Sequence, residues 1–146
     1  MINITFPEIK NALDNFHLPI FDIVIGIAEG GLVPAALTAN KLGAELACVK
    51  INYRDDNNIP VFKKPAIIRP LNGNIQGKSI LIVDDVAVTG KTLEEARSLF
   101  IGNKITTFVF KGKADYVLLP DLKDCVNWPW KYANNSQIIL ETHQTI

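Results

Sequence analysis

Short apolar runs recur along the chain and mark the strands of a buried sheet. Residues 22 to 28 (DIVIGIA), 45 to 51 (ELACVKI) and 79 to 83 (SILIV) are almost wholly apolar and rich in β-branched side chains. Runs of this kind are typical of strands that are covered on both faces. Two more strands are predicted at residues 105 to 110 and 115 to 119.

Segments with helical spacing lie between these strands and carry helix boundary signals. Residues 5 to 8 (TFPE) form a capping box that starts a short amphipathic helix. A second helix is predicted from Pro34 to about Leu42, ended by Gly43, and a third from Lys91 to Ile101, ended by Gly102. Strands that alternate with helices predict an α/β fold, with a parallel sheet, helices on both faces and ligand sites at the carboxyl ends of the strands.

The remaining segments predict one domain with two irregular parts. The 146 residues suit a single domain, and neither a repeat nor a linker divides them. Residues 53 to 66 (YRDDNNIPVFKKPA) are too polar for the core, which predicts a mobile excursion. Residues 125 to 143 predict an irregular aromatic segment followed by an edge strand.

Composition excludes several classes of protein. Fifteen basic residues balance fifteen acidic ones, so no net field attracts the whole molecule to nucleic acid or an anionic membrane. Two cysteines and two histidines provide neither a disulfide framework nor a zinc cluster. No apolar run reaches the roughly 18 residues of a membrane span, and residues 1 to 20 lack the apolar centre of a signal peptide. We therefore expect a soluble, cytoplasmic protein without nucleic-acid or membrane partners.

The chemistry is concentrated in residues 80 to 93 (ILIVDDVAVTGKTL). A buried strand delivers Asp84 and Asp85 at its tip, and residues 89 to 92 (TGKT) then present backbone N–H groups and hydroxyls at a helix start. The second half is suited to bind an anion. Carboxylates repel phosphate, so the acidic pair must face sugar hydroxyls or a divalent cation. A ribose with a 5-phosphate fits both parts of this segment, because its hydroxyls can face the acidic pair and its phosphate can face residues 89 to 92.

Three alternatives are weaker. A nucleotide-binding P-loop requires glycine where this chain has Asp85. A receiver domain would begin with such a strand, but too little chain follows residue 80 to complete one. In the third, the acidic pair merely caps the following helix.

The residues from 80 to 93 resemble the phosphoribosylpyrophosphate (PRPP) signature of type I phosphoribosyltransferases. Residues 23 to 43 (IVIGIAEGGLVPAALTANKLG) resemble the pyrophosphate loop and following helix of that family, in the family's order and spacing. Residues 109 to 119 (VFKGKADYVLL) and 124 to 132 (DCVNWPWKY) are similar to the lysine and the carboxy-terminal hood of the xanthine-guanine branch. The resemblance implies a single phosphoribosyltransferase domain over residues 1 to 146. Its small hood would comprise about residues 111 to 146 together with N-terminal residues.

The resemblance also implies roles for individual residues. Catalytic roles fall on Asp84, Asp85 and Lys111, with Asp85 as the Mg²⁺ ligand and Lys111 donating to a 6-oxo group. The PRPP site would comprise Asp84, Asp85, Val86, Ala87, Val88, Thr89, Gly90, Lys91 and Thr92. Pyrophosphate would be bound by Ala28, Glu29, Gly30 and Gly31. The base would be bound by Lys111, Cys125 and Val126, and Tyr53 and Arg54 would belong to a lid.

Three positions depart from the purine branch of the family. Val88 stands where 6-oxopurine enzymes usually carry an aspartate that accepts a proton from the base. Glu29 replaces an Arg or Lys beside pyrophosphate, and at ~4 Å a carboxylate would cost about 4 kcal/mol per unit charge at an effective dielectric of 20. We therefore expect its side chain to turn away. Cys125 takes the place of a stacking aromatic residue, unless Trp128 or Tyr132 substitutes; Trp128 could equally be a core anchor.

The function implied is transfer of 5-phosphoribosyl from PRPP to a nucleobase, a 6-oxopurine in purine salvage, with Mg²⁺ as cofactor. Resemblance to the family also implies a homodimer or homotetramer. The alternative is a non-catalytic regulatory protein of the same fold that binds PRPP or a nucleotide, because Glu29, Val88 and Cys125 would then be relaxed catalytic positions.

Overall fold

The computed structural model describes residues 1–51, 66–69 and 75–132, which fall into two compact units. The larger unit is Leu18–Pro120, and the smaller combines Met1–His17 with the segment that begins at Asp121. Residues 111 to 120, where the predicted hood begins, are grouped with the larger unit.

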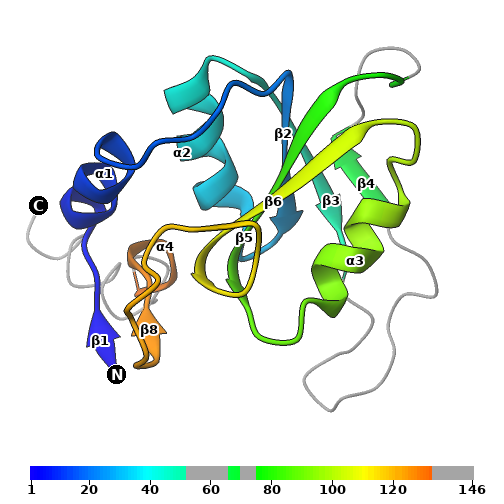
Figure 1. The fold of residues 1–146 in the computed structure, drawn as a ribbon. Coiled ribbons are helices and arrows are strands. Elements are labelled where there is room, and N and C mark those ends of the chain that lie inside the picture. Colours follow the sequence, from blue (N-terminus) through cyan, green and yellow to red (C-terminus); the bar gives the residue numbers. More distant parts are fainter. Residues whose placement is uncertain (52–65, 70–74, 133–146) are drawn as a thin grey trace, which may run out of the picture. The chain divides into compact units, whose positions relative to one another are not determined.

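The larger unit contains a six-stranded sheet in the order β4-β3-β2-β5-β6-β7 (Figure 1). The strands are β2 (Ile23–Ala28), β3 (Glu45–Lys50), β4 (Ala66–Arg69), β5 (Ser79–Ala87), β6 (Lys104–Gly112) and β7 (Tyr116–Val117). Every described pairing is parallel except that of β4 with β3. The predicted parallel α/β sheet is confirmed, with one antiparallel edge strand that the sequence pattern did not indicate.

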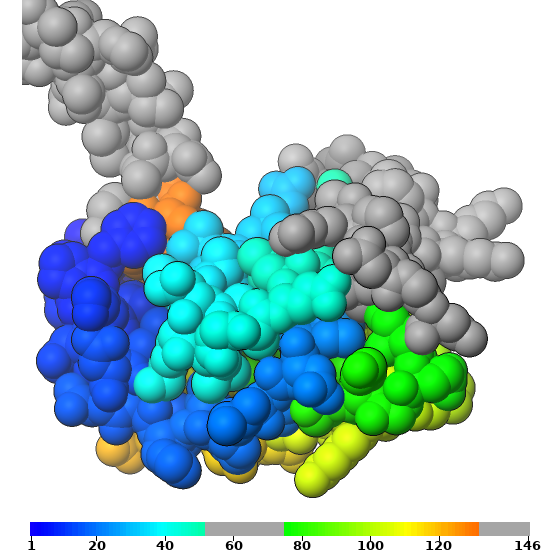
Figure 2. Space-filling view, turned by 90° about the horizontal axis from the view of Figure 1, so that it is seen from above, coloured from blue at the N-terminus to red at the C-terminus, as the bar shows by residue number. Residues whose placement is uncertain are grey.

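Helices α2 (Leu32–Leu42) and α3 (Lys91–Ser98) cover opposite faces of this sheet (Figure 1). On one face, Gly26 of β2 lets α2 approach so closely that an added Cβ would lie 2.6 Å from the Cβ of Ala35. In the space-filling view, the cyan residues of α2 and β3 form one continuous surface (Figure 2).

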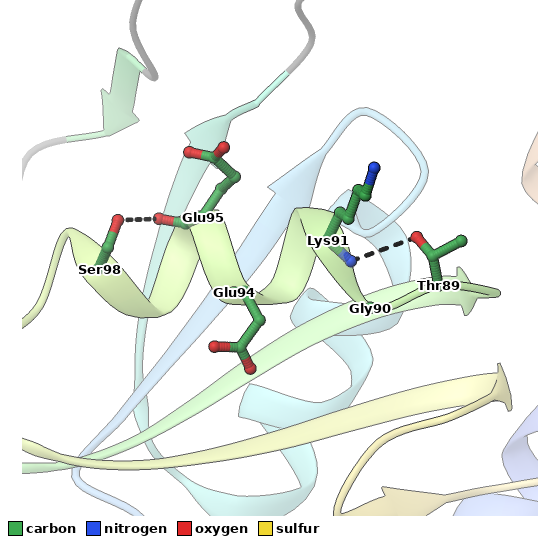
Figure 3. Close-up of a pocket in the computed structure, with 6 residues that line it drawn as sticks. All are labelled: Thr89, Gly90, Lys91, Glu94, Glu95 and Ser98. Carbon is green, nitrogen blue, oxygen red and sulfur yellow. Dashed lines mark hydrogen bonds between the residues drawn. The ribbon is translucent and has the colours of Figure 1, made fainter.

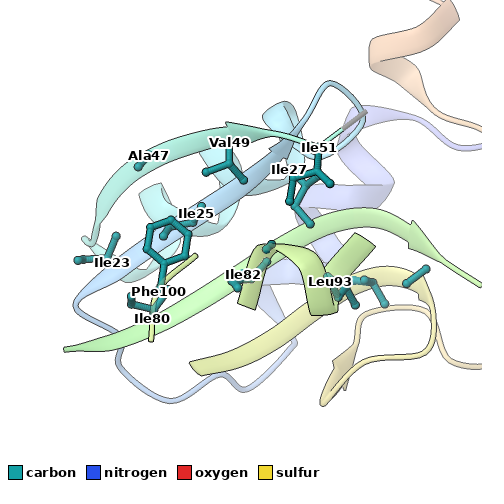
Figure 4. Packing of buried hydrophobic residues seen from close by; sticks show 13 residues of the cluster. Ile23, Ile25, Ile27, Ala47, Val49, Ile51, Ile80, Ile82, Leu93 and Phe100 are labelled. Atoms are coloured by element: carbon teal, nitrogen blue, oxygen red, sulfur yellow. The ribbon is translucent and has the colours of Figure 1, made fainter. Parts of the chain in front are cut away.

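The other face of the sheet packs against the α3 segment in a single apolar cluster (Figure 4). Ile80 and Ile82 of β5 are fully buried there, together with Leu93 of α3. Each such side chain contributes roughly 1.5–3 kcal/mol through removal of its surface from water. The core therefore fixes α3 against the end of β5, where the acidic pair lies.

The predicted helix ends differ in detail from those observed. Helix α2 begins at Leu32, two residues before Pro34, and ends at Gly43 as expected, whose φ of 64° is the left-handed conformation. Helix α3 ends at Ser98 rather than Ile101, because the N–H groups of Leu99 and Phe100 bond three residues back and tighten the chain.

Strand β5 is longer than predicted. The sequence suggests that it ends at Val83, but its pairing with β6 continues through Asp84 opposite Val109 and Ala87 opposite Gly112. The two carboxylates are therefore inside the last part of a paired strand rather than in the loop after it. The physical reason is that β6 extends equally far, so that Asp84, Val86 and Ala87 of β5 all have a paired residue on β6.

The smaller unit joins the two ends of the described chain. Strand β1 (Ile2–Asn3) pairs in parallel with β8 (Val126–Asn127), and helices α1 (Phe6–Asp14) and α4 (Pro129–Tyr132) complete it. The predicted capping box is confirmed: Thr5 Oγ1 accepts from the Glu8 N–H, and a Glu8 carboxylate oxygen accepts from the Thr5 N–H. The predicted edge strand after the aromatic segment lies outside the described residues. No helix in the described ranges has the length and apolar content needed to span a bilayer.

Candidate active site

The turn after β5 encloses a hollow of about 230 Å³. It is lined by Asp84 and by the continuous segment Val86–Leu93. Gly90 makes the turn possible, because its φ of 82° is a conformation that L side chains rarely adopt. The hollow has the size of a phosphate or sugar-phosphate group rather than of a whole nucleotide.

Helix α3 begins directly at this hollow, and neither aspartate caps it. Its N-cap residue is Gly90, which has no side-chain capping bond, while Thr89 Oγ1 accepts from the Lys91 N–H at 3.3 Å. Helix capping therefore does not explain the acidic pair. The start of a helix is also the end that attracts anions, through its N–H groups and its dipole.

Asp84 and Asp85 are both buried, with 9% and 7% of their surfaces exposed. The Asp85 N–H donates to Asp84 Oδ1 at 2.8 Å, and the Val86 N–H donates to Asp85 Oδ1 at 2.7 Å. Buried carboxylates are costly unless hydrogen bonds or cations compensate them. Their backbone partners supply part of that compensation.

The two carboxylates have different surroundings. Asp84 lines the hollow before α3, whereas Asp85 lies against the loop that follows β2. A Cβ added at Gly30 would be 2.7 Å from each carboxylate oxygen of Asp85, so only glycine fits there without displacing the side chain. The structure thus brings together the two segments that carry the family resemblance.

The loop after β2 is held close to β5. The Gly31 N–H donates to the Ile27 carbonyl oxygen at 2.7 Å, and a Cβ at Gly31 would be 2.6 Å from the carbonyl oxygens of Ile27 and Val83. The peptide bond between Ala28 and Glu29 is cis. Gly31 is therefore a position at which the loop backbone lies close against β5.

Glu29 extends from this loop toward β3 and is largely exposed. Its Oε1 lies 3.5 Å from Nζ of Lys50, the last residue of β3, whose side chain is 31% exposed against 78% for Glu29. The sequence pattern did not single out Lys50 for a role. Its place at a strand end, where ligands gather in this fold, was the available signal.

Lys111 is in β6, and Val88 is in the turn after β5. Lys111 is opposite Val86 in the pairing of β5 with β6, so its strand position adjoins the predicted PRPP segment. Val88 is 76% exposed, which is unusual for an apolar side chain at the mouth of a polar hollow. An exposed valine there supplies neither a proton acceptor nor a charge.

A wider, shallow depression of about 450 Å³ lies along the outer side of α3 (Figure 3). It shares Thr89, Gly90 and Lys91 with the turn and continues along Glu94, Glu95 and Ser98. In Figure 3, Glu94 and Glu95 point to opposite sides of the helix. The depression therefore continues from the turn along α3 and has both basic and acidic residues in its lining.

Other predicted site residues lie elsewhere. Tyr53 and Arg54 are outside the described residues. Cys125 is exposed and Val126 is in β8, both in the smaller unit. Trp128 and Trp130 are buried there, with ring centroids 5.2 Å apart in a stacked arrangement, as expected for core anchors.

The acidic pair fits a magnesium ion that is shared with a ligand. Within the part of the chain that the structure covers, no cluster of three or more His, Cys, Asp or Glu side chains could hold a metal. Mg²⁺ is often bound by only one or two carboxylates together with substrate phosphates and water. Asp84 and Asp85 are suited to that mode and not to a metal site made by the protein alone.

Comparison with known proteins identifies relatives of the sheet and its loops. Residues 13–130 match the phosphoribosyl transferase domain family. An orotate phosphoribosyltransferase from Sulfurisphaera tokodaii is 30% identical over 88 residues, which cover 60% of this chain and 40% of that protein. The transcriptional regulator GfcR of Methanosarcina mazei is 39% identical over 74 residues, covering 51% and 35%. The chain thus matches less than half the length of these two relatives.

Two solved structures have the same fold. A purine phosphoribosyltransferase from Pyrococcus horikoshii has 25% identity and a TM-score of 0.64, with 89% of this chain and 93% of that chain covered. The xanthine-guanine-hypoxanthine phosphoribosyltransferase of Helicobacter pylori has 13% identity and a TM-score of 0.69, with 97% and 98% covered. The second comparison concerns the fold alone.

Proposed function

Because the chain belongs to the phosphoribosyl transferase domain family, we propose that it transfers 5-phosphoribosyl from PRPP to a nucleobase and releases pyrophosphate. The observation that carries this proposal is the contact of Asp85 with Gly30, because it places the loop after β2 beside Asp85, whose neighbour Asp84 lines the hollow before α3. A ligand with a phosphate at one end and a diphosphate at the other matches these two neighbouring regions.

Each part of the site has a role toward PRPP. The 5-phosphate would lie against the backbone N–H groups and hydroxyls of residues 87 to 92, at the positive end of α3. Asp84, at the edge of that hollow, would accept from the ribose hydroxyls. Asp85 and the backbone of Ala28–Gly31 would face the diphosphate and its magnesium ion.

The reaction balances without any redox or covalent protein intermediate. A nitrogen of the base forms a bond to C1 of the ribose as the bond from C1 to the diphosphate oxygen breaks, and the base loses one proton. Positive charge develops on the sugar, near the two buried carboxylates, which stabilise it. The chemistry that bound Mg²⁺ supplies is neutralisation of the charge on the departing diphosphate.

The acceptor proposed is a 6-oxopurine, as in purine salvage. The support is Lys111 at the end of β6, beside the PRPP segment, where its ammonium group could donate to a 6-oxo group. For Cys125 and Val126, which belong to the smaller unit, base binding stays a prediction. The relatives include an orotate phosphoribosyltransferase and a purine phosphoribosyltransferase, so an experiment must identify the acceptor base.

The direct test incubates the protein with PRPP, Mg²⁺ and one base at a time: guanine, xanthine, hypoxanthine, adenine or orotate. Pyrophosphate release is the readout, and omission of the base is the control. We expect release with a 6-oxopurine. Pyrophosphate release with orotate or adenine alone would identify a different acceptor. PRPP binding without pyrophosphate release in the presence of any of these bases would favour the non-catalytic alternative. Light scattering tests the proposed homodimer or homotetramer.

A further inference from the structure

The loop that faces the diphosphate carries an acidic side chain, and a lysine from the next strand compensates it. Lys50 is opposite Ala28 in the pairing of β3 with β2, at the carboxyl end of its strand. Its Nζ reaches across to Glu29 Oε1 at 3.5 Å. Lysine is suited to this, because its ammonium group is a compact charge on a flexible stem.

The pair contributes little to folding, because the Glu29 side chain is 78% exposed. Exposed ion pairs are weak, since water screens them and both side chains lose freedom. Breaking the contact between Lys50 and Glu29 therefore costs little when a stronger anion approaches. A diphosphate is such an anion, because it offers several charged oxygens to one cation.

We propose that Lys50 is the diphosphate-binding cation of this site and that Glu29 holds its ammonium group beside the loop until the ligand arrives. On binding, the Lys50 ammonium moves from Glu29 to a diphosphate oxygen, and the Glu29 carboxylate turns toward solvent. The lysine thereby supplies the positive charge that Glu29 does not.

This inference rests on the proposed function for the identity of the ligand, but it makes a separate prediction about charge. Lys50 should affect the affinity for diphosphate and not the affinity for ribose 5-phosphate, which lacks that group. Glu29 should oppose diphosphate binding, and its effect should depend on Lys50, because the two side chains interact directly.

The experiment is calorimetry with magnesium pyrophosphate and, separately, ribose 5-phosphate. The variants are Lys50→Met, Glu29→Gln and the double variant. Lys10→Met is the matched control, because Lys10 forms an exposed pair with Asp14 within α1 of the smaller unit. We expect Lys50→Met to weaken pyrophosphate binding about tenfold or more with ribose 5-phosphate affinity unchanged. Glu29→Gln should strengthen pyrophosphate binding in the presence of Lys50 and have a smaller effect in its absence.

The outcomes separate the two proposals. Unchanged pyrophosphate affinity in Lys50→Met, in a protein that still binds ribose 5-phosphate, overturns the role of Lys50 and leaves the transferase proposal standing. If pyrophosphate affinity depends on Lys50 but the protein transfers phosphoribosyl to no base, the role of Lys50 is supported and the proposed function is wrong. Equal losses for both ligands would identify a general structural effect and overturn the specific role.

Discussion

The main chain of Gly30 lies directly against the carboxylate of Asp85, so closely that a Cβ added at Gly30 would be 2.7 Å from both carboxylate oxygens. This relationship ties the loop after β2 to the end of β5. Each of these segments resembles one half of a PRPP site, and their contact places the two halves next to each other.

Gly30→Ala should therefore displace the Asp85 carboxylate rather than unfold the protein. We expect affinity for PRPP with Mg²⁺ to fall about tenfold, equivalent to roughly 1.4 kcal/mol. Calorimetry measures the affinity, and urea unfolding measures stability. Ala36→Ser, at an exposed position on α2, is the control. Full PRPP affinity in Gly30→Ala would show that the contact has no bearing on ligand binding.

Val88→Asp tests the acceptor. If the protein is a 6-oxopurine enzyme that lacks its proton acceptor, the new carboxylate should raise turnover with guanine, xanthine or hypoxanthine. General-base catalysis contributes about 10²–10⁴-fold, which sets the upper range of the gain. The exposed position of Val88 makes the substitution compatible with folding. Steady-state pyrophosphate release is the measurement, and Val88→Asn is the uncharged control.

The purine assignment fails if Val88→Asp binds PRPP normally yet shows unchanged or lower rates with all three bases. The rates are compared at saturating PRPP, because the new charge lies beside the hollow before α3.

Asp22 gives the structure a defined response to acid. Hydrogen bonds from the Ser79 N–H and then from its hydroxyl lower the pKa of Asp22 below its ordinary value. A lowered folded-state pKa contributes stability above the unfolded-state pKa, near pH 4, and that stability is lost as pH falls through the folded-state value. Ser79→Ala should thus reduce stability more at pH 7 than in strong acid.

NMR titration and urea unfolding at several pH values measure this effect. The pKa of Asp22 should rise toward its ordinary value in Ser79→Ala. Ser98→Ala, whose hydroxyl bonds the Glu95 carbonyl oxygen on α3, should leave that pKa unchanged. If the pKa of Asp22 is the same in wild type and Ser79→Ala, the Ser79 hydroxyl does not lower it, which would contradict this account.

Local sequence signals predicted local features correctly. The capping box at Thr5 and the helix stop at Gly43 depend on residues within one turn of each other, and the structure confirms both. The buried strand predicted over residues 22 to 28 is also confirmed: β2 spans residues 23–28, and all six are apolar or glycine and buried. These features depend on few long-range contacts.

Features that depend on distant partners were missed. Strand β5 continues past Asp84 because β6 pairs with it, and polar side chains conceal such a continuation in the sequence. The contact of Gly30 with Asp85 joins residues far apart in the chain, as does the pair of Glu29 with Lys50. Topology brings those residues together, so spacing along the sequence could not reveal them.

The central claim is that the buried acidic pair binds the ribose and diphosphate side of PRPP. Calorimetry of PRPP with Mg²⁺ tests it most directly, on wild type and on the variant that carries both Asp84→Asn and Asp85→Asn. Urea unfolding confirms that the variant is folded. We predict clear binding by wild type and a loss of at least about 100-fold in the double variant, because both charge-assisted partners of the ligand disappear. Equal affinity in a folded double variant would contradict the assignment of this site.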